Sequence, residues 1–182
     1  STRVRSSAAS DVYKRQQERQ SWLQISYMKE AYHTMGPKFT LGWMAEALYS
    51  SKNFSENYTA TMMQAGEFAP TPHSKLMYNE AFRANQYVAA GIKPIYVLND
   101  MFQFRTEFYG FTPIFPIKKN ALNKAYYGKA FSRFEYMGEV SVICHLPFGA
   151  ISAYVNHYSS PRREWNVGMT IGWQLFNYRF VE

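Results

Sequence analysis

The sequence predicts an all-β protein built as an antiparallel, up-and-down arrangement of about nine strands. Three observations predict this fold class: apolar and polar residues alternate along several segments, turn motifs separate these segments, and many segments have about 11–17 residues. Alternation with a period of two is typical of strands with two different faces, and helical spacing fits these segments less well. The predicted strands are about 20–33, 37–50, 57–68, 74–82, 86–98, 101–114, 129–145, 149–158 and 164–181.

Composition limits the class of protein. The chain has 182 residues, of which 47% are hydrophobic and 18% aromatic, and this aromatic share excludes a disordered chain. Its single cysteine, Cys144, excludes an intramolecular disulfide framework and a Cys-rich zinc site. The longest uncharged run, Val140 to Pro161, is interrupted by His145 and Pro147, so no segment is predicted to be a membrane-spanning helix.

The first residues are predicted to be foreign to the natural protein. The stretch from Ser6 to Gln16 looks like a translated sequencing adapter, so residues 1–15 are expected to be disordered and residues 16–182 to form the domain. Residues 1–15 carry four basic residues and one acidic residue, and without them the formal net charge falls from +7 to +4. This smaller charge gives little reason to expect a nucleic-acid partner.

Alternation is clearest in four segments, each with an apolar face and a more polar face. In segment 129–145, for example, Phe134 and Val140 share one face, and Glu135 and Glu139 share the other. The apolar faces comprise Phe39, Leu41, Trp43, Ala45, Ala47 and Tyr49, then Phe102, Phe104, Phe108 and Ile114, then Phe134, Tyr136, Gly138, Val140, Val142, Cys144 and Leu146, and finally Trp165, Val167, Met169, Ile171, Trp173 and Leu175. The charged residues opposite them are Arg105, Glu107, Arg133, Glu135 and Glu139.

Turn motifs divide the strands and alternate in length. Gly36-Pro37, Asn99-Asp100 and Pro147-Phe148-Gly149 are short enough for hairpins. The longer and more polar connections are 51–56, 115–128 and 158–163. Segments 57–68 and 74–82 are the least regular of the predicted strands, because their polarity is mixed and a Pro-Thr-Pro motif lies between them.

These patterns favour a transmembrane β-barrel. A tilted strand needs about 9–11 residues to cross a bilayer, and several predicted strands reach that length. The apolar face would contact lipid and the charged face would line a polar interior, because every peptide group must pair within a closed sheet. Since bacterial single-chain barrels have even strand numbers, nine strands indicate the C-terminal portion of a larger barrel. With the C-terminus in the periplasm, all the tight turns fall on the periplasmic side.

The same alternation leaves soluble folds open. In a β-sandwich or a lipocalin-like (calycin) binding module, the apolar face would point into a core and the charged face toward water. Strand length and the low charge of the apolar faces favour the membrane over these alternatives.

The end of the chain carries alternating aromatic residues, Phe176, Tyr178 and Phe180. This segment resembles the closing strand of outer-membrane barrels, although Val181 and Glu182 follow the last aromatic residue. The resemblance implies recognition by the barrel assembly machinery of the bacterial outer membrane.

Three stretches in the middle of the chain carry a more specific resemblance: Pro70-Thr71-Pro72-His73-Ser74, Phe82-Arg83-Ala84-Asn85 and Ala89-Ala90-Gly91-Ile92-Lys93-Pro94-Ile95-Tyr96. Together with the end of the chain, they resemble the C-terminal barrel region of patatin-like phospholipases of the Bacteroidetes type. Those proteins join an N-terminal patatin hydrolase domain to a surface-antigen barrel of the Omp85 superfamily. The resemblance implies an outer-membrane location, contact with lipid, and a role in anchoring or exporting an upstream lipid acyl hydrolase domain.

The same resemblance gives one site residue. In a barrel of sixteen strands, the connection around Arg83 would fall between strands eleven and twelve, where Omp85 proteins carry a loop with an arginine motif inside the barrel. A lumen-anchoring role for Arg83 is therefore implied, although Ala84 stands where that motif has a glycine. An ordinary turn arginine is the alternative.

Catalytic motifs are missing from the sequence. A patatin hydrolase needs a Gly-x-Ser-x-Gly nucleophile elbow, and the chain has none, so it is expected to be inactive by itself. Cys144 and His145 are adjacent and would point to opposite faces of a strand, so they cannot form a nucleophile–base pair. The histidines lack metal-ligand spacing, and no cofactor is expected. An Omp85-type translocation or assembly barrel without a hydrolase is the alternative function.

Overall fold

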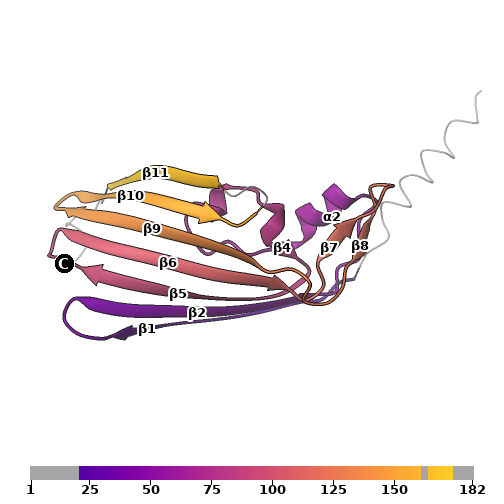
Figure 1. The fold of residues 1–182 in the computed structure, drawn as a ribbon, viewed down its shortest axis with the longest axis horizontal. Coiled ribbons are helices and arrows are strands. Elements are labelled where there is room, and N and C mark those ends of the chain that lie inside the picture. Colours follow the sequence, from indigo (N-terminus) through magenta and orange to yellow (C-terminus); the bar gives the residue numbers. More distant parts are fainter. Residues whose placement is uncertain (1–20, 161–163, 174–182) are drawn as a thin grey trace, which may run out of the picture.

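A seven-stranded antiparallel sheet forms most of the structure (Figure 1). The computed structural model describes residues 21–160 and 164–173. The strands are, in spatial order, β1 (Gln24–Thr34), β2 (Phe39–Ser50), β5 (Gln86–Val97), β6 (Phe102–Pro113), β9 (Glu135–Leu146), β10 (Gly149–Tyr158) and β11 (Glu164–Trp173). Every neighbouring pair is antiparallel, so the prediction of an all-β, antiparallel fold is confirmed.

The sheet is open within the described part of the chain, because β1 pairs only with β2 and β11 only with β10. The seven strands match seven of the nine predicted ones. The strand predicted to start at residue 129 begins at Glu135 instead, since Phe131 adopts a positive φ of 50° that interrupts an extended chain. The predicted closing residues Phe176, Tyr178 and Phe180 lie outside the described residues, as do residues 1–15.

The predicted strands 57–68 and 74–82 are wrong. Their place is taken by helix α2 (Tyr58–Gln64), the 3-10 turns η1 (Ser74–Leu76) and η2 (Glu80–Phe82), and two-residue strands β3 (Gly66–Glu67) and β4 (Arg83–Ala84). None of the helices in the described ranges is long and apolar enough to cross a membrane.

Side-chain caps explain why this region turns instead of extending. The Asn57 side chain accepts a hydrogen bond of 2.8 Å from the backbone N–H of Ala60, which starts α2. The Asn79 side chain accepts one of 2.9 Å from the backbone N–H of Ala81, which starts η2. Such caps satisfy backbone donors that a strand would have to pair with a neighbouring strand.

Short and long connections lie at opposite ends of the sheet (Figure 1). The β1–β2 turn contains Gly36 with φ +129°, a conformation that favours glycine. In the β5–β6 turn, the Asn99 side chain accepts hydrogen bonds from the backbone N–H groups of Met101 and Phe102, at 3.0 and 2.7 Å. The opposite end carries α2 and the hairpin of β7 (Ile117–Lys119) and β8 (Ala125–Tyr127).

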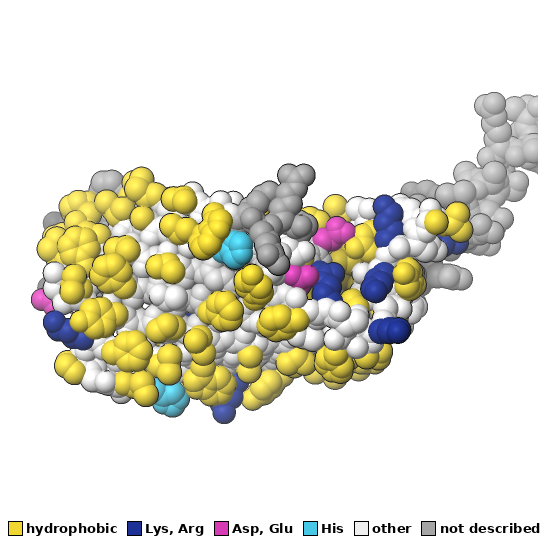
Figure 2. Space-filling view, in the orientation of Figure 1, with side chains coloured by type: hydrophobic (Ala, Val, Ile, Leu, Met, Phe, Trp, Pro, Cys, Tyr) yellow, Lys and Arg dark blue, Asp and Glu magenta, His cyan; other side chains and the backbone are white. Residues whose placement is uncertain are grey.

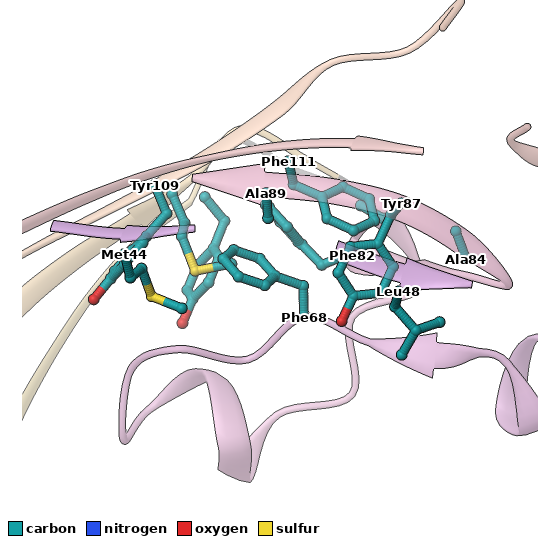
Figure 3. Close-up of a cluster of buried hydrophobic side chains, with 12 residues drawn as sticks. Met44, Leu48, Phe68, Phe82, Ala84, Tyr87, Ala89, Tyr109 and Phe111 are labelled. Carbon is teal, nitrogen blue, oxygen red and sulfur yellow. The ribbon is translucent and has the colours of Figure 1, made fainter. Parts of the chain in front are cut away.

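Residues 51–85, which we call the covering segment, fold over one face of the sheet. Phe68 lies at the centre of the contact, with its ring centroid 6.1 Å from that of Tyr87, 6.0 Å from Tyr109 and 5.9 Å from Phe111 (Figure 3). The residues of this core are Met44, Leu48, Phe68, Ala81, Phe82, Ala84, Tyr87, Ala89, Tyr109, Phe111, Met137 and Tyr158. The main core therefore lies between the covering segment and five strands of the sheet.

Replacing Phe68 tests whether this contact stabilises the fold. We expect Phe68→Ala to lower the free energy of unfolding by about 3–5 kcal/mol, because a buried aromatic ring is lost and leaves a cavity. Urea titration followed by near-UV circular dichroism measures the change. Phe104→Ala, whose side chain is 40% exposed on the opposite face, is the control and should cost less than about 1 kcal/mol. Equal losses in the two variants would contradict this packing.

Candidate functional site: a charged sheet face beneath the covering segment

The two faces of the sheet differ sharply in chemistry. We call the face under residues 51–85 the covered face and the opposite one the bare face. On the bare face, Phe108 and Val140 are 49% and 52% exposed, although both lie on central strands. On the covered face, Glu107 and Glu139 are only 5% and 7% exposed. Apolar groups thus meet the surroundings while carboxylates are enclosed, which is the reverse of an ordinary water-soluble sheet.

The bare face is apolar over nearly its whole extent. Figure 2 shows hydrophobic side chains spread over the strands, with few charged ones among them. The exposed apolar residues of this face, from β1 to β11, are Ile25, Tyr27, Tyr49, Val88, Ile92, Tyr96, Phe102, Phe104, Phe108, Val140, Val155, Trp165, Val167, Met169 and Ile171. A continuous apolar surface of this extent is typical of a surface that contacts another protein or a membrane.

Strand register sets up a polar row on the covered face. Glu107 of β6 lies directly opposite Glu139 of β9, which in turn lies opposite Asn156 of β10. All three residues are buried, and each has at least one side-chain oxygen without a hydrogen-bond partner. The guanidinium of Arg105 lies close enough to act electrostatically on both carboxylates. Both signs of charge are therefore enclosed in the same small region.

A second charged pair connects β1 to β5 across β2. The Lys93 ammonium binds the Glu30 carboxylate, which also accepts a hydrogen bond of 2.6 Å from the Tyr32 hydroxyl. Gly42 of β2 lies beneath this pair, and a Cβ there would come within 2.6 Å of the Tyr32 ring. The glycine therefore leaves the space in which the bridge forms.

Arg83 holds the covering segment in shape. One guanidinium nitrogen donates to the carbonyls of Met62, Met63 and Ala65, at 3.3, 3.1 and 3.3 Å. The other donates to the Glu67 carboxylate at 2.6 Å. The guanidinium also lies 4.8 Å from the centre of the Tyr78 ring. A single side chain thus connects the end of α2 to β3 and to the end of the segment.

Several polar contacts fix the covering segment to the sheet. The Tyr87 hydroxyl donates to the Glu46 carboxylate at 2.6 Å and to the Glu67 carbonyl at 3.2 Å. The His73 ring nitrogen Nδ1 lies 2.8 Å from the Tyr158 hydroxyl. Arg133 hydrogen-bonds the carbonyl of Ala81. These contacts reach β5, β10 and the start of β9, so the segment is attached at several separate points.

A small pocket with both polar and apolar lining residues remains between the covering segment and the sheet. It has a volume of about 140 Å³ and opens between η1 and strands β6, β9, β10 and β11. Its polar lining residues are His73, Arg105, Glu139, Ser141, Ser152, Tyr154 and Thr170. Among the described residues, no group of three or more His, Cys, Asp or Glu side chains is placed to hold a metal ion.

The predicted site residues lie in three places. Arg105, Glu107, Glu135 and Glu139 lie on the covered face, as the alternation placed them on one face. Arg133 precedes β9 and pairs with Glu135 at 3.0 Å. Arg83 lies in the covering segment and not in a short turn between two strands, and its contacts are within that segment.

Sequence reasoning missed four polar residues of this region: Glu30, Lys93, Tyr87 and Asn156. Lys93 is the one charged residue in the predicted strand 86–98, and by alternation it lies on the same face as Tyr87. That isolation is a signal which could have identified it. The partnership with Glu30 could not be found in the same way, because it depends on the pairing of β1 and β5 with β2.

Comparison with family models, with curated proteins and with solved structures finds no match to this chain.

Replacing Arg83 tests the anchoring network. We expect Arg83→Lys to lower the free energy of unfolding by about 1–3 kcal/mol. A lysine ammonium cannot donate to the backbone carbonyls and to the Glu67 carboxylate at the same time, as the two nitrogens of the guanidinium do. Trypsin cleavage after the exposed Lys75 should accelerate as the segment opens. Glu67→Gln keeps an acceptor and is the control, with a loss below about 1 kcal/mol. The interpretation is wrong if the two variants behave alike.

The attachment of His73 predicts a dependence on pH. Burial lowers the pKa of His73 below its ordinary value of 6.5, so the folded protein favours the neutral ring. The unfolded chain then binds more protons, and this contribution to stability is complete above pH 6.5 and is lost as the pH falls through the lowered pKa. We expect cleavage after Lys75 in the wild type, relative to His73→Gln at the same pH, to rise below pH 6.5. A ratio that stays constant between pH 5 and 8 would refute the prediction.

Proposed function

We propose that this chain is the C-terminal part of a transmembrane β-barrel of the bacterial outer membrane. In this proposal, lipid contacts the bare face, and the covered face lines an interior that the covering segment partly fills. The observation that carries the proposal is the inverted sheet, with Phe108 and Val140 about half exposed and Glu107 and Glu139 enclosed. Lipid removes the cost of exposed apolar groups, whereas water does not.

Strand length and pairing support the same conclusion. The seven strands have 10–12 residues each, which suits a tilted crossing of a bilayer, where about 9–11 residues are needed. Each inner strand pairs along its length with two neighbours. Such pairing leaves few peptide groups unsatisfied where no water is present. The edges at β1 and β11 would pair with further strands of the larger barrel.

A soluble binding module is the less favoured alternative. A sandwich or calycin fold would place Phe108, Val140 and Trp165 against a second layer, yet these side chains are exposed in the described structure. The same fold would place Glu107 and Glu139 in water, and they are buried instead. Burial of a carboxylate is costly unless polar partners surround it, so the covered face is better explained as a polar interior.

We further propose that the barrel anchors or exports a patatin-like lipid acyl hydrolase carried upstream in the intact protein. The stretches that resemble this family lie in two consecutive parts of the fold. Residues 70–74 and 82–85 belong to the covering segment, and residues 89–96 belong to β5, which directly follows it. If β11 is the last of sixteen strands, then β2 and β5 are strands eleven and twelve, with Arg83 between them. That is the place of the arginine loop in the Omp85 superfamily.

Reading the coding sequence upstream tests the hydrolase. A Gly-x-Ser-x-Gly motif that follows a strand would support it. Small periplasmic modules alone would favour a translocation or assembly barrel of the same superfamily. In either case we propose that outer-membrane lipid surrounds the barrel, and that the barrel assembly machinery recognises the segment with Phe176, Tyr178 and Phe180.

A substitution that introduces a charge on the bare face distinguishes a membrane-inserted protein from a soluble one. Val140 lies at mid-strand between Thr106 of β6 and Val155 of β10 and is 52% exposed. We expect Val140→Lys to destabilise the membrane-inserted fold by about 2–4 kcal/mol, since lysine near the middle of a bilayer loses its hydration. In a soluble protein the same exposed position would tolerate lysine within about 0.5 kcal/mol. Flotation with phosphatidylcholine vesicles and urea unfolding from those vesicles measure the difference.

Thr170→Lys is the matched control for that experiment. Thr170 lies on an exposed stretch of β11, but it lines the small pocket beneath the covering segment and shares the covered face. We expect this lysine to leave insertion within about 1 kcal/mol of the wild type. A chain that stays monomeric in water and does not float with vesicles would overturn the proposal.

A further inference from the structure

We propose that the β7–β8 hairpin and its flanks bind the phosphate groups of anionic lipid headgroups at the membrane surface. This inference rests on the proposed function, because it assumes that the strands cross a bilayer. It adds a lipid-binding surface to a region that the barrel proposal leaves without a role.

The charge of this region is entirely of one sign. Residues 108–134 contain five basic residues and no acidic residue. Arg133 pairs with Glu135, so it is already neutralised. The other four, Lys118, Lys119, Lys124 and Lys129, are exposed, and no ion pair joins any of them to a residue in the described parts of the chain. Four unpaired positive charges are thus gathered on one short structure.

The hairpin is held firmly in place. Ile117 is buried against Met62 and Ala65, at and just after the C-terminal end of α2. In the loop, the Asn120 side chain accepts hydrogen bonds from the backbone N–H groups of Leu122 and Lys124, at 3.0 and 2.8 Å. The lysines are therefore presented by an ordered turn, so little conformational entropy of the backbone is lost when a ligand binds.

Lysine and aromatic groups share the outer side of the hairpin. Lys118 lies directly opposite Tyr126, so the two side chains project from the same side, away from buried Ile117. The Lys118 side chain passes over Gly128, where a Cβ would come within 2.8 Å of its Cε. Phe131 beyond the hairpin is 63% exposed. Exposed rings beside lysines suit the headgroup region of a membrane, which is apolar on one side and charged on the other.

The position of the hairpin matches that region. It lies at the end of the sheet with the long connections, and Lys and Arg side chains gather at this end of the molecule (Figure 2). Phe115 and Phe134, which flank the hairpin in sequence, are 39% and 64% exposed where β6 has ended and β9 begins. If the strands span the bilayer, the lysines stand just beyond its apolar layer. Phosphate is the anion found there, and lysine binds it as a mobile point charge.

Lipid titration in neutral detergent tests this surface with the full chain. The protein in dodecyl maltoside micelles is titrated with fluorescent phosphatidylglycerol and, separately, with fluorescent phosphatidylcholine. We expect tighter binding of phosphatidylglycerol, and weaker binding by roughly fivefold for each lysine that Lys118→Gln, Lys119→Gln, Lys124→Gln or Lys129→Gln removes, in single and combined variants. The difference between the two lipids should shrink as the salt concentration rises.

The matched control removes the same charge elsewhere. The double variant Lys118→Gln/Lys119→Gln is compared with Lys38→Gln/Lys75→Gln, whose exposed lysines lie in the tight turn at the far end and in η1 of the covering segment. Only the first pair should lose preference for phosphatidylglycerol. Equal losses in both pairs, or equal affinity of the wild type for the two lipids, would overturn the proposal.

Two competition arms identify the source of the phosphate. Inorganic phosphate or a single-stranded oligonucleotide is added at the same phosphate concentration as the lipid. Displacement of the lipid by either competitor would overturn the assignment to a membrane surface, and failure of both to displace it supports the assignment. Circular dichroism and vesicle flotation of the hairpin variants keep this result separate from the barrel proposal, because variants that still insert and retain the sheet have lost only the headgroup contact.

Discussion

The structure depends on the alternation of side chains along antiparallel strands that are paired in register. Because every second side chain shares a face, the pairing of Glu107 with Glu139 necessarily puts Phe108 and Val140 on the opposite side. A shift of one residue between β6 and β9 would bring carboxylates to the bare face and phenyl rings to the covered face. The register therefore decides at once which groups are enclosed, where the covering segment packs and what surrounds the molecule.

The covering segment supplies what the sheet lacks on its polar side. Phe68 and Phe82 bring apolar area to a face that also carries carboxylates, so the core forms at one end of that face while the polar row occupies its middle. Arg83 keeps the segment in the shape that presents Phe68, since its guanidinium joins α2 to β3. The covering segment thus both encloses the charged residues and buries the aromatic rings.

Much of the sheet could be predicted from the sequence, because strand faces are a local property. The alternation in 101–114 and 129–145 placed Arg105, Glu107 and Glu139 on one face, which is where they lie. The two strands predicted at 57–68 and 74–82 were wrong because local caps from Asn57 and Asn79 outweigh a weak alternation. Contacts that join distant strands, such as Glu30 with Lys93, depend on pairing and leave no local trace.

The two outer strands of the described sheet have a practical consequence for handling the protein. Along β1, and along the described part of β11, one side of the backbone has no sheet neighbour. The unpaired amide and carbonyl groups along such an edge can hydrogen-bond to any extended peptide. They can also join the sheets of separate molecules edge to edge. Aggregation through these two edges would therefore compete with folding whenever this chain is produced by itself.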